Sequence, residues 1–510
     1  MNNGLSAVIA VLMMICWAQA SLAIPAEESP VSADAVARER AALRSALAES
    51  QKEKVDSTAL SLSLKAILAD SAFSALSEEE RHAAYLFYGA VLYDTRQFAD
   101  ARAPLTIASE MPQGGVFDWN VRLSNDFALH DYADAVSAAT KIAKTWPEKL
   151  TDYSDRAILL LAHESGQLPA ASERDFLETL HDMHWKPKSE FSTADSAWLS
   201  LVRLRLERGD SKGAGMIAAD LSDPASIVAL QIDNRFDGIV RDQPARFDAM
   251  KAYEASLADM KSKSAAAPNK LEGVNSVAEL LIVMRRPDEA LALVSAALEK
   301  LKADPKAYVD AEDKRNWTED IRSRALFDLG RSEEGFAALK AGADQKEDGQ
   351  INVSQAINLA DEYNTFDRPK DALSAISAID LPNASDYGRM ALQDARACAY
   401  FGLGDTANLA KTLDYMRAHR KDGMQPYLNA MLFTGNLDDA AAEVVAALQD
   451  PAQRTGILGF LQDYAPDPHP TKRSAAVHEA WIAIRSRPDV AAEIAKVGHI
   501  NSYALHLPTY

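Results

Sequence analysis

The chain has 510 residues, of which 48% are hydrophobic, 25% charged and 7% aromatic. This composition is that of a globular protein and excludes a mainly disordered, collagen-like or polytopic membrane protein. The formal net charge of −20 repels phosphate backbones and anionic lipid headgroups, so nucleic acid is not an expected partner. At about 100–200 residues per domain the length predicts three domains, unless the chain is a repeat array.

The N-terminus has the pattern of an export signal. Residues 7–17 form an uninterrupted apolar run, and Ser21 and Ala23 supply the small residues that signal peptidase requires. One feature departs from this pattern, because the residues before the run carry no Lys or Arg. A membrane anchor is the competing interpretation, but the apolar run is short for a bilayer span of about 20 residues. We therefore expect a signal peptide at residues 1–23, cleavage after Ala23, a periplasmic or secreted protein, and no membrane span in the mature chain. Cleavage leaves Cys398 alone, so no intramolecular disulfide is expected.

Helical periodicity dominates residues 33–465. Ser77 and Glu80 have the spacing of a capping box, in which the hydroxyl and the carboxylate satisfy free backbone amides at the start of a helix. Alanine is abundant, and prolines fall between the periodic segments, where they stop or restart helices. The pattern predicts an all-α fold.

One turn layout recurs nine times along the chain. A turn residue is followed by a polar residue, and a small or apolar residue lies five positions after the first. The first two turns are 34 residues apart, later spacings reach 45, and one spacing of 76 predicts a degenerate repeat between Asp223 and Ala267. One helix pair cannot bury its apolar face alone, so stacked pairs are expected. The nine turns begin at Arg96, His130, Gly166, Gly209, Arg285, Gly330, Asp367, Gly404 and Gly435.

Residues 85–101 resemble a tetratricopeptide repeat. The family's small and large packing positions are occupied by Gly89, Phe98 and Ala101, and one unit later by Tyr132 and Ala135. The resemblance implies an α-solenoid of tetratricopeptide-like helix-turn-helix repeats, which forms a right-handed superhelix. It also implies a concave groove that binds a protein or peptide partner.

The same register places four side chains toward the groove, namely Tyr93, Asn120, Ser124 and Phe127. The alternative for the two aromatic residues is that they pack between neighbouring repeats, as aromatic stripes usually do. Leu86 and Ala90 occupy groove-facing places where chaperone-binding members need Lys or Asn, so a partner with a free acidic C-terminus is not implied.

Both ends of the array differ from the repeats. Residues 24–56 are expected to form a leader and an N-terminal capping helix, followed by the solenoid at residues 57–465. A proline-rich boundary lies at residues 465–470. Residues 466–510 are expected to form a C-terminal helical cap, with two short helices, and an extended tail. The tail, residues 500–510, is interpreted as a strap over the last helix pair, and a partner-binding peptide is the alternative.

Motifs for catalysis are missing from the sequence, including His-Glu-x-x-His, Gly-x-Ser-x-Gly, a phosphate loop and Cys-x-x-Cys. His181 and His184 have the i, i+3 spacing of a helical metal pair, but no third ligand is evident, so no metal or cofactor is expected. The sequence thus predicts a non-enzymatic, exported scaffold that binds a protein or peptide partner in the cell envelope, in envelope assembly or polymer export. One alternative is an accessory enzyme that acts on cell-wall glycan or peptide through a carboxylate acid or base. Another is a component of an outer-membrane export machine.

Overall fold

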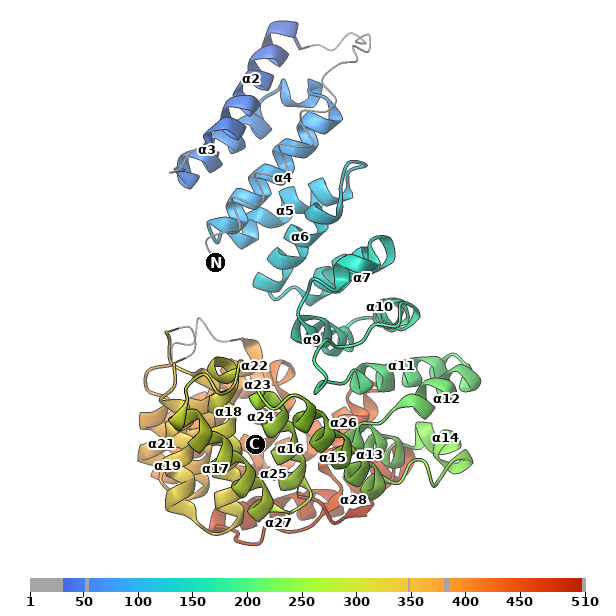
Figure 1. Ribbon diagram of the computed structural model, residues 1–510, viewed down its shortest axis with the longest axis vertical. Coiled ribbons are helices and arrows are strands. Elements are labelled where there is room, and N and C mark those ends of the chain that lie inside the picture. The colour runs from blue at the N-terminus through green and yellow to red at the C-terminus, as the bar shows by residue number, and fades with distance from the viewer. Residues whose placement is uncertain (1–30, 51–54, 347–348, 380–384, 507–510) are drawn as a thin grey trace. The chain divides into compact units, whose positions relative to one another are not determined.

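The computed structural model describes residues 31–50, 55–346, 349–379 and 385–506 (Figure 1). The expected signal peptide and nearly all of the leader lie outside these residues. The chain divides into two compact units, residues 1–187 (unit 1) and residues 188–510 (unit 2). None of the described helices has both the length and the apolar character needed to cross a membrane.

Unit 1 consists of successive helices (Figure 1). They are α2 (Ala33–Glu49), α3 (Ser57–Ala69), η1 (Phe73–Ala75), α4 (Glu78–Asp94), α5 (Phe98–Glu110), α6 (Val116–Ala128), α7 (Tyr132–Thr145), α8 (Pro147–Leu150), α9 (Asp155–Ser165) and α10 (Ala170–Asp182). The predicted capping box at Ser77 and Glu80 begins α4.

Unit 2 is also helical, with one short pair of strands. Its first helices are α11 (Asp195–Glu207), α12 (Ser211–Asp220), α13 (Pro224–Ile232), η2 (Asn234–Phe236), α14 (Asp237–Asp242), α15 (Ala249–Ala266), α16 (Leu271–Val283), α17 (Pro287–Ala303), α18 (Ala311–Asp328) and α19 (Ser332–Ala343). The rest are α20 (Val353–Thr365), α21 (Pro369–Ala375), α22 (Asp386–Leu403), α23 (Thr406–Ala418), η4 (Arg420–Asp422), α24 (Met424–Phe433), α25 (Leu437–Gln449), α26 (Arg454–Phe460), β1 (Asp463–Tyr464), α27 (Lys472–Ser486), α28 (Pro488–Val497) and β2 (Ser502–Tyr503).

Each of the nine predicted turns joins the two helices of one pair, here called helix A and helix B. In eight of them the first turn residue has a positive φ, between 54° at His130 and 80° at Gly209. The next residue donates its backbone N–H to the carbonyl five positions earlier, as Gln97 does to Leu92 at 2.8 Å. This is the Schellman arrangement that satisfies free carbonyls at a helix end. The predicted helix-turn-helix repeat is confirmed.

The turn at Gly166 differs from the other eight. Its φ is −62°, and Ala171, the expected small packing residue, is exposed. Pro169 favours an extended conformation at Leu168, the residue before it. This turn is therefore one residue longer than the turn at Arg96, and its backbone hydrogen bonds join residues three positions apart. The left-handed residue in this part of the chain is instead His184, beyond the end of α10.

The degenerate repeat between Asp223 and Ala267 is present as α13 and α15, which contact each other. The short elements η2 and α14 are inserted between them. This insertion accounts for the double spacing in the sequence pattern.

Small residues lie where helix A and helix B approach most closely. Ala101 and Ala135 are fully buried, whereas Phe98 and Tyr132 are half-buried. A Cβ atom added to Gly89 would lie 2.6 Å from Cγ of Leu105 and 3.2 Å from its backbone nitrogen. The close contact of α4 and α5 therefore depends on the missing side chain at Gly89.

We expect Gly89→Ala to lower the free energy of unfolding of unit 1 by about 1–3 kcal/mol, because the methyl group overpacks the contact with α5. Chemical denaturation with hydrogen exchange across α4 and α5 measures this effect. Gly215→Ala, where an added Cβ meets no atom within 4 Å, is the matched control. An unchanged stability for Gly89→Ala would contradict the packing role.

In unit 1 the helices contact their neighbours in sequence, from α2 on α3 to α9 on α10. Unit 2 departs from that rule, because α13 also packs against α26. Asp233, at the end of α13, forms an antiparallel bridge with Gly498 and accepts a hydrogen bond from Thr455 at 2.7 Å. The expectation that stacked neighbouring pairs alone bury the apolar faces is therefore wrong for unit 2, because α26 also contacts α13.

The C-terminal strap, here residues 465–506 and so longer than the tail alone, adds to this closure. It contains two short helices, α27 and α28, as the sequence predicts, and β2 pairs in parallel with β1. The backbone N–H of His506 donates to the carbonyl of Val283 at the end of α16, and the Tyr503 hydroxyl lies 2.9 Å from Oε1 of Gln231 in α13. The tail, residues 500–510, was expected over the last helix pair, but its described part, up to residue 506, reaches helices more than 200 residues earlier.

On its way the strap follows the ends of helix A in successive repeats. Arg285 donates to the carbonyl of Pro466 at 2.9 Å, and the His469 ring lies against Gly330. Arg473 donates to Asp367 at 3.2 Å, and its guanidinium lies 5.1 Å from the ring centre of Phe401. One edge of unit 2 is thereby covered. The fold is an all-α solenoid of tetratricopeptide-like helix-turn-helix repeats that forms a superhelix.

Candidate functional site: the A-helix face of unit 2

Polar side chains recur at two equivalent positions of helix A, ten and six residues before the left-handed turn residue. We call this set the A-helix face of unit 2. The A helices of neighbouring repeats contact one another, as α16 does α18 and α22 does α24, so the set forms a row in which Glu279 is exposed and Asn275, Asp320, Asp394 and Cys398 are buried. Its members are Asn275, Glu279, Asp320, Arg324, Asp361, Asp394, Cys398 and Asn429.

Side-chain hydrogen bonds connect this face from one repeat to the next. The amide of Asn358 donates to Asp320 at 3.0 Å, and the amide of Asn429 donates to Asp394 at 2.7 Å. At the first repeat of the series, the Thr318 hydroxyl donates to Asn275 at 2.9 Å. These bonds join α16 to α18, α18 to α20 and α22 to α24, and they hold the polar groups in fixed positions, which is the pre-organisation that a binding surface needs.

Carboxylates outnumber cations among the eight side chains of the face. Arg324 supplies the positive charge, with Nε 3.1 Å from Asp320 and Nη2 3.6 Å from Glu279. Burial raises the pKa of Glu279, and Asp320 adds to the effect, although the Glu279 side chain is 54% exposed. The Arg324 guanidinium opposes this shift in the pKa of Glu279, because it favours the charged carboxylate.

A pair of carboxyl groups lies further along the face. Burial raises the pKa of Asp361 well above its usual value, and the charges of Asp394 and Glu362 add to the effect. Burial likewise raises the pKa of Asp394 to about 7, opposed by its hydrogen bonds with Asn429 and Cys398. Two carboxyl groups this close disfavour ionisation of both, so the pair holds a proton near neutral pH.

The lone cysteine belongs to this pair. Cys398 is buried, and its thiol donates to Asp394 at 3.4 Å. Burial raises the pKa of the thiol well above its usual value, and the nearby carboxylates add to the effect. A thiol held in this form is a poor nucleophile, so Cys398 acts as a hydrogen-bond donor in the packing of α22.

Among the predicted groove residues, Asn120 and Ser124 occupy the same two helix positions in α6 of unit 1. The Tyr153 hydroxyl donates to Oδ1 of Asn120, and the Ser124 hydroxyl bonds the Asn120 carbonyl. Tyr93 is half-buried, packs against the unit 1 core and lies 5.6 Å from the Phe98 ring, and Phe127 is half-buried. Partner binding at these four residues stays a prediction.

The acidic face of unit 2 was missed because the groove register was applied to the first two repeats alone. The signal was present in the sequence. Counting back ten and six residues from the five turn residues finds every member without any structure. These turn residues are Arg285, Gly330, Asp367, Gly404 and Gly435. What the sequence does not show is that protein surrounds these carboxylates.

A buried carboxylate in unit 1 gives a pH-dependent prediction. Asp126 is 1% exposed, neither of its carboxylate oxygens has a hydrogen-bond partner, and Nε of Arg122 is 4.0 Å away. Burial, with a contribution from Asp134, raises the pKa of Asp126 to about 7. The folded state therefore binds this proton more tightly than the unfolded state does.

We expect this carboxylate to reduce the free energy of unfolding as the pH rises from about 4 to about 7, with no further loss above 7. Asp126→Asn should remove that dependence and stabilise unit 1 at pH 8 by about 1–2 kcal/mol, since no charge is then buried. Denaturation of both proteins at several pH values measures the difference. A constant difference across the pH range would contradict the assignment.

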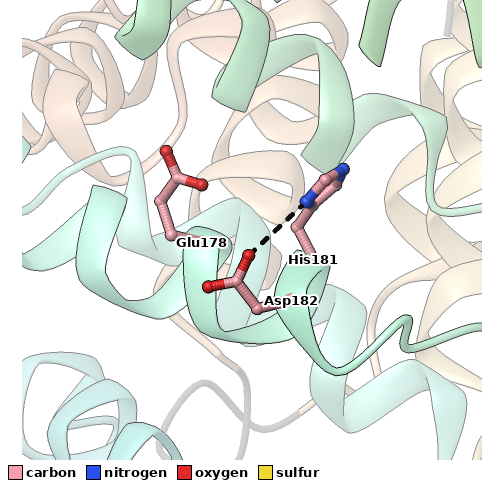
Figure 2. A group of neighbouring side chains, drawn as sticks. All are labelled: Glu178, His181 and Asp182. Carbon is pink, nitrogen blue, oxygen red and sulfur yellow. Dashed lines mark ion pairs between the residues drawn. The ribbon is translucent and has the colours of Figure 1, made fainter. Parts of the chain in front are cut away.

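A second polar cluster lies on α10 (Figure 2). Ligand atoms of Glu178, His181 and Asp182 lie within 4.8 Å of one another, and Nδ1 of His181 is 3.9 Å from Asp182. His184 does not join them, because α10 ends at Asp182 and His184 has left-handed backbone geometry. Such groups are common on helix surfaces without an ion, so the cluster supports no metal assignment.

Comparisons with known proteins leave the family open. No protein-family model matches the chain, and no curated protein matches it in sequence. Similar solved structures include the hetero-tetramer of the APC/C proteins Cut9 and Hcn1, with 13% identity, coverage of 91% of this chain and 96% of that chain, and a TM-score of 0.29. The TPR domain of P58(IPK) has 16% identity, coverage of 79% and 97%, and a TM-score of 0.17. Naa15/Naa10 bound to HypK-THB has 13% identity, coverage of 90% and 70%, and a TM-score of 0.22.

These TM-scores are too low to carry an argument, and the assignment of the fold rests on the chain's own repeats. The recurring left-handed turns, the buried small residues and the contacts between successive helix pairs define it as a tetratricopeptide-like α-solenoid.

Proposed function

We propose that the protein is a non-enzymatic scaffold that binds a protein or peptide partner on the A-helix face of unit 2. The observation that carries the proposal is the row of polar side chains on α16, α18, α20, α22 and α24, in which side-chain hydrogen bonds join α16 to α18, α18 to α20 and α22 to α24. A surface that repeats in register with the helices suits an extended segment, because equivalent groups recur along its length.

The proposed setting is the cell envelope. The apolar run at residues 7–17 and the small residues before position 24 support export, and envelope assembly or polymer export is the proposed context. Fractionation of cells and N-terminal sequencing of the protein test this part. A mature chain that begins at Ile24 in the periplasm or medium is expected, and an uncleaved cytoplasmic chain would overturn it.

Affinity capture from an envelope fraction tests the binding surface. Glu279→Lys reverses a charge on the A-helix face, and Glu299→Lys makes the same change on α17, where Glu299 is 74% exposed. We expect one reproducible partner for the native protein and for Glu299→Lys, and its loss with Glu279→Lys. Capture by all three proteins, or by none, would overturn the proposed surface.

An enzyme that acts on cell-wall glycan or peptide is the second candidate. The raised pKa of about 7 at Asp394 favours it, since a general acid needs a proton near neutral pH. However, Asp394 is 5% exposed, and its oxygens already accept from Asn429 and Cys398. The burial of Asp394 and its hydrogen bonds therefore favour the scaffold over the enzyme. Glycan or peptide cleavage by the purified protein, lost in Asp394→Asn, would reverse that conclusion.

A further inference from the structure

We propose that α27 is a flap that opens separately from the rest of unit 2. When closed, it covers an aromatic edge of the repeats, formed by Phe401 on α22 and Phe433 on α24. α27 contacts α20, α24 and α25 of the array and α28 of the strap. The closed flap therefore excludes a partner from this edge, and the open flap admits one.

α27 buries few of its side chains. Of its 15 residues Ile484 alone is buried, while Val477 and Trp481 are half-buried. The next helix, α28, has 10 residues and buries four of them. Because apolar burial is the main favourable term when a helix docks, α27 is held more weakly than the helix that follows it.

Three arginines attach α27 and its C-terminal cap to carboxylates elsewhere in unit 2. The carboxylates are all more than half exposed, so water solvates both partners once they separate and salt screens their attraction. The docking of α27 is therefore expected to weaken as the salt concentration rises. The pairs are Arg473 with Asp367 at 3.2 Å, Arg485 with Asp463 at 3.6 Å and Arg487 with Asp438 at 2.6 Å.

The two ends of α27 are joints. Three prolines within residues 466–470 precede it and donate no backbone N–H, and Arg487 after it has extended geometry, with φ −61° and ψ 138°. The elements beyond these joints are fixed independently of α27. The backbone N–H of Ala465 donates to the carbonyl of Leu505 at 3.1 Å, and α28 packs against α25. α27 can therefore leave its place while β1, β2 and α28 stay docked.

The edge that α27 covers is aromatic. The rings of Phe401 and Phe433 lie edge to face, with their centres 6.2 Å apart. The guanidinium of Arg473 lies 5.1 Å and 5.3 Å from those centres, and both rings are half-buried with α27 in place. Opening removes the Arg473 side chain from the rings. Since aromatic side chains are enriched in the cores of protein interfaces, the opened edge suits a protein partner.

Hydrogen exchange and footprinting of the mature full-length protein test the flap. Mass spectrometry compares the exchange of α25, α27 and α28 at about 0.1 M and about 1 M sodium chloride. Hydroxyl-radical footprinting measures the oxidation of Phe401 and Phe433. Neither ring belongs to the A-helix face, so the result does not depend on the proposed function.

Two pairs of variants separate the contacts of α27 from effects elsewhere. Ile484→Ala removes the buried side chain, and its control on the same helix, Ile482→Ala, truncates a side chain that is 41% exposed. Arg473→Gln removes the charge beside the aromatic rings. Its control, Arg331→Gln, breaks an exposed pair with Glu334 at 2.7 Å near the start of α19.

In the native protein we expect α27 to exchange at least about tenfold faster than α25 and α28, and about two- to fivefold faster again at the higher salt concentration. Ile484→Ala should accelerate exchange in α27 at least about tenfold and increase the oxidation of both rings. Arg473→Gln should accelerate it about two- to fivefold, and both controls should stay within about twofold of native.

Three results would overturn the inference. If α27 exchanges at the same rate as α25 in the native protein, it opens only with the whole unit. If Ile484→Ala accelerates α25 and α28 as much as α27, the flap is not separate. If the oxidation of Phe401 and Phe433 is unchanged in a variant whose α27 exchanges faster, α27 does not cover this edge.

Discussion

Asp233→Ala is expected to lower the free energy of unfolding of unit 2 by about 3–5 kcal/mol. Asp233 is fully buried where α13 meets α26, and it accepts from Nη2 of Arg235 at 2.6 Å and from the Thr455 hydroxyl at 2.7 Å. Removing the carboxylate leaves the Arg235 guanidinium, whose side chain is 14% exposed, without its main ion pair. Urea denaturation of the full-length protein, with hydrogen exchange in α13 and α26, measures the loss.

A neighbouring aspartate provides the control. Asp237 pairs with His499 at 2.9 Å across the same closure, but its side chain is 50% exposed. Asp237→Ala should cost less than about 1 kcal/mol, because water solvates both partners after the change. Equal losses in the two variants would contradict a special role for the buried carboxylate.

Phe87→Ala is expected to lower the free energy of unfolding of unit 1 by about 3–5 kcal/mol. Phe87 is fully buried in α4, within the apolar cluster that α2, α3 and α5 also line. The substitution removes a large side chain and leaves a cavity that rigid neighbouring helices fill only in part. Denaturation followed by hydrogen exchange in α3 to α5 checks the effect.

Leu62→Ala on α3 is the matched control, because Leu62 is 65% exposed and its truncation opens no cavity. We expect it to change stability by less than about 0.5 kcal/mol. A loss of similar size in both variants would mean that the cluster around Phe87 does not determine the stability of unit 1.

The repeats could be predicted because their signal is local. A left-handed residue such as Gly330 or Asp367 ends helix A, and the backbone bonds that follow depend on neighbouring residues. The exception at Gly166 is also local, since Pro169 restricts the residue before it. Helix boundaries and turn positions therefore follow from short stretches of sequence.

The closure of unit 2 could not be predicted in this way. It depends on the small rotation between successive repeats, which accumulates until α26 reaches α13. No residue pattern near Asp233 or Thr455 indicates that the two residues meet, because more than 200 residues separate them. The A-helix face lies between these cases: its residue types are visible in the sequence, but the burial of Asp320 and Asp394 is not.

The closure has a mechanical consequence for unit 2. An open solenoid behaves as a spring, whose pitch varies because each repeat contacts only its neighbours. Here the bonds of Asp233 with Thr455 and of His506 with Val283 join α13 to α26 and the end of α16 to the C-terminal strap, so a change in pitch between them must break these bonds. The spacing between carboxylates on successive helices is thereby held constant.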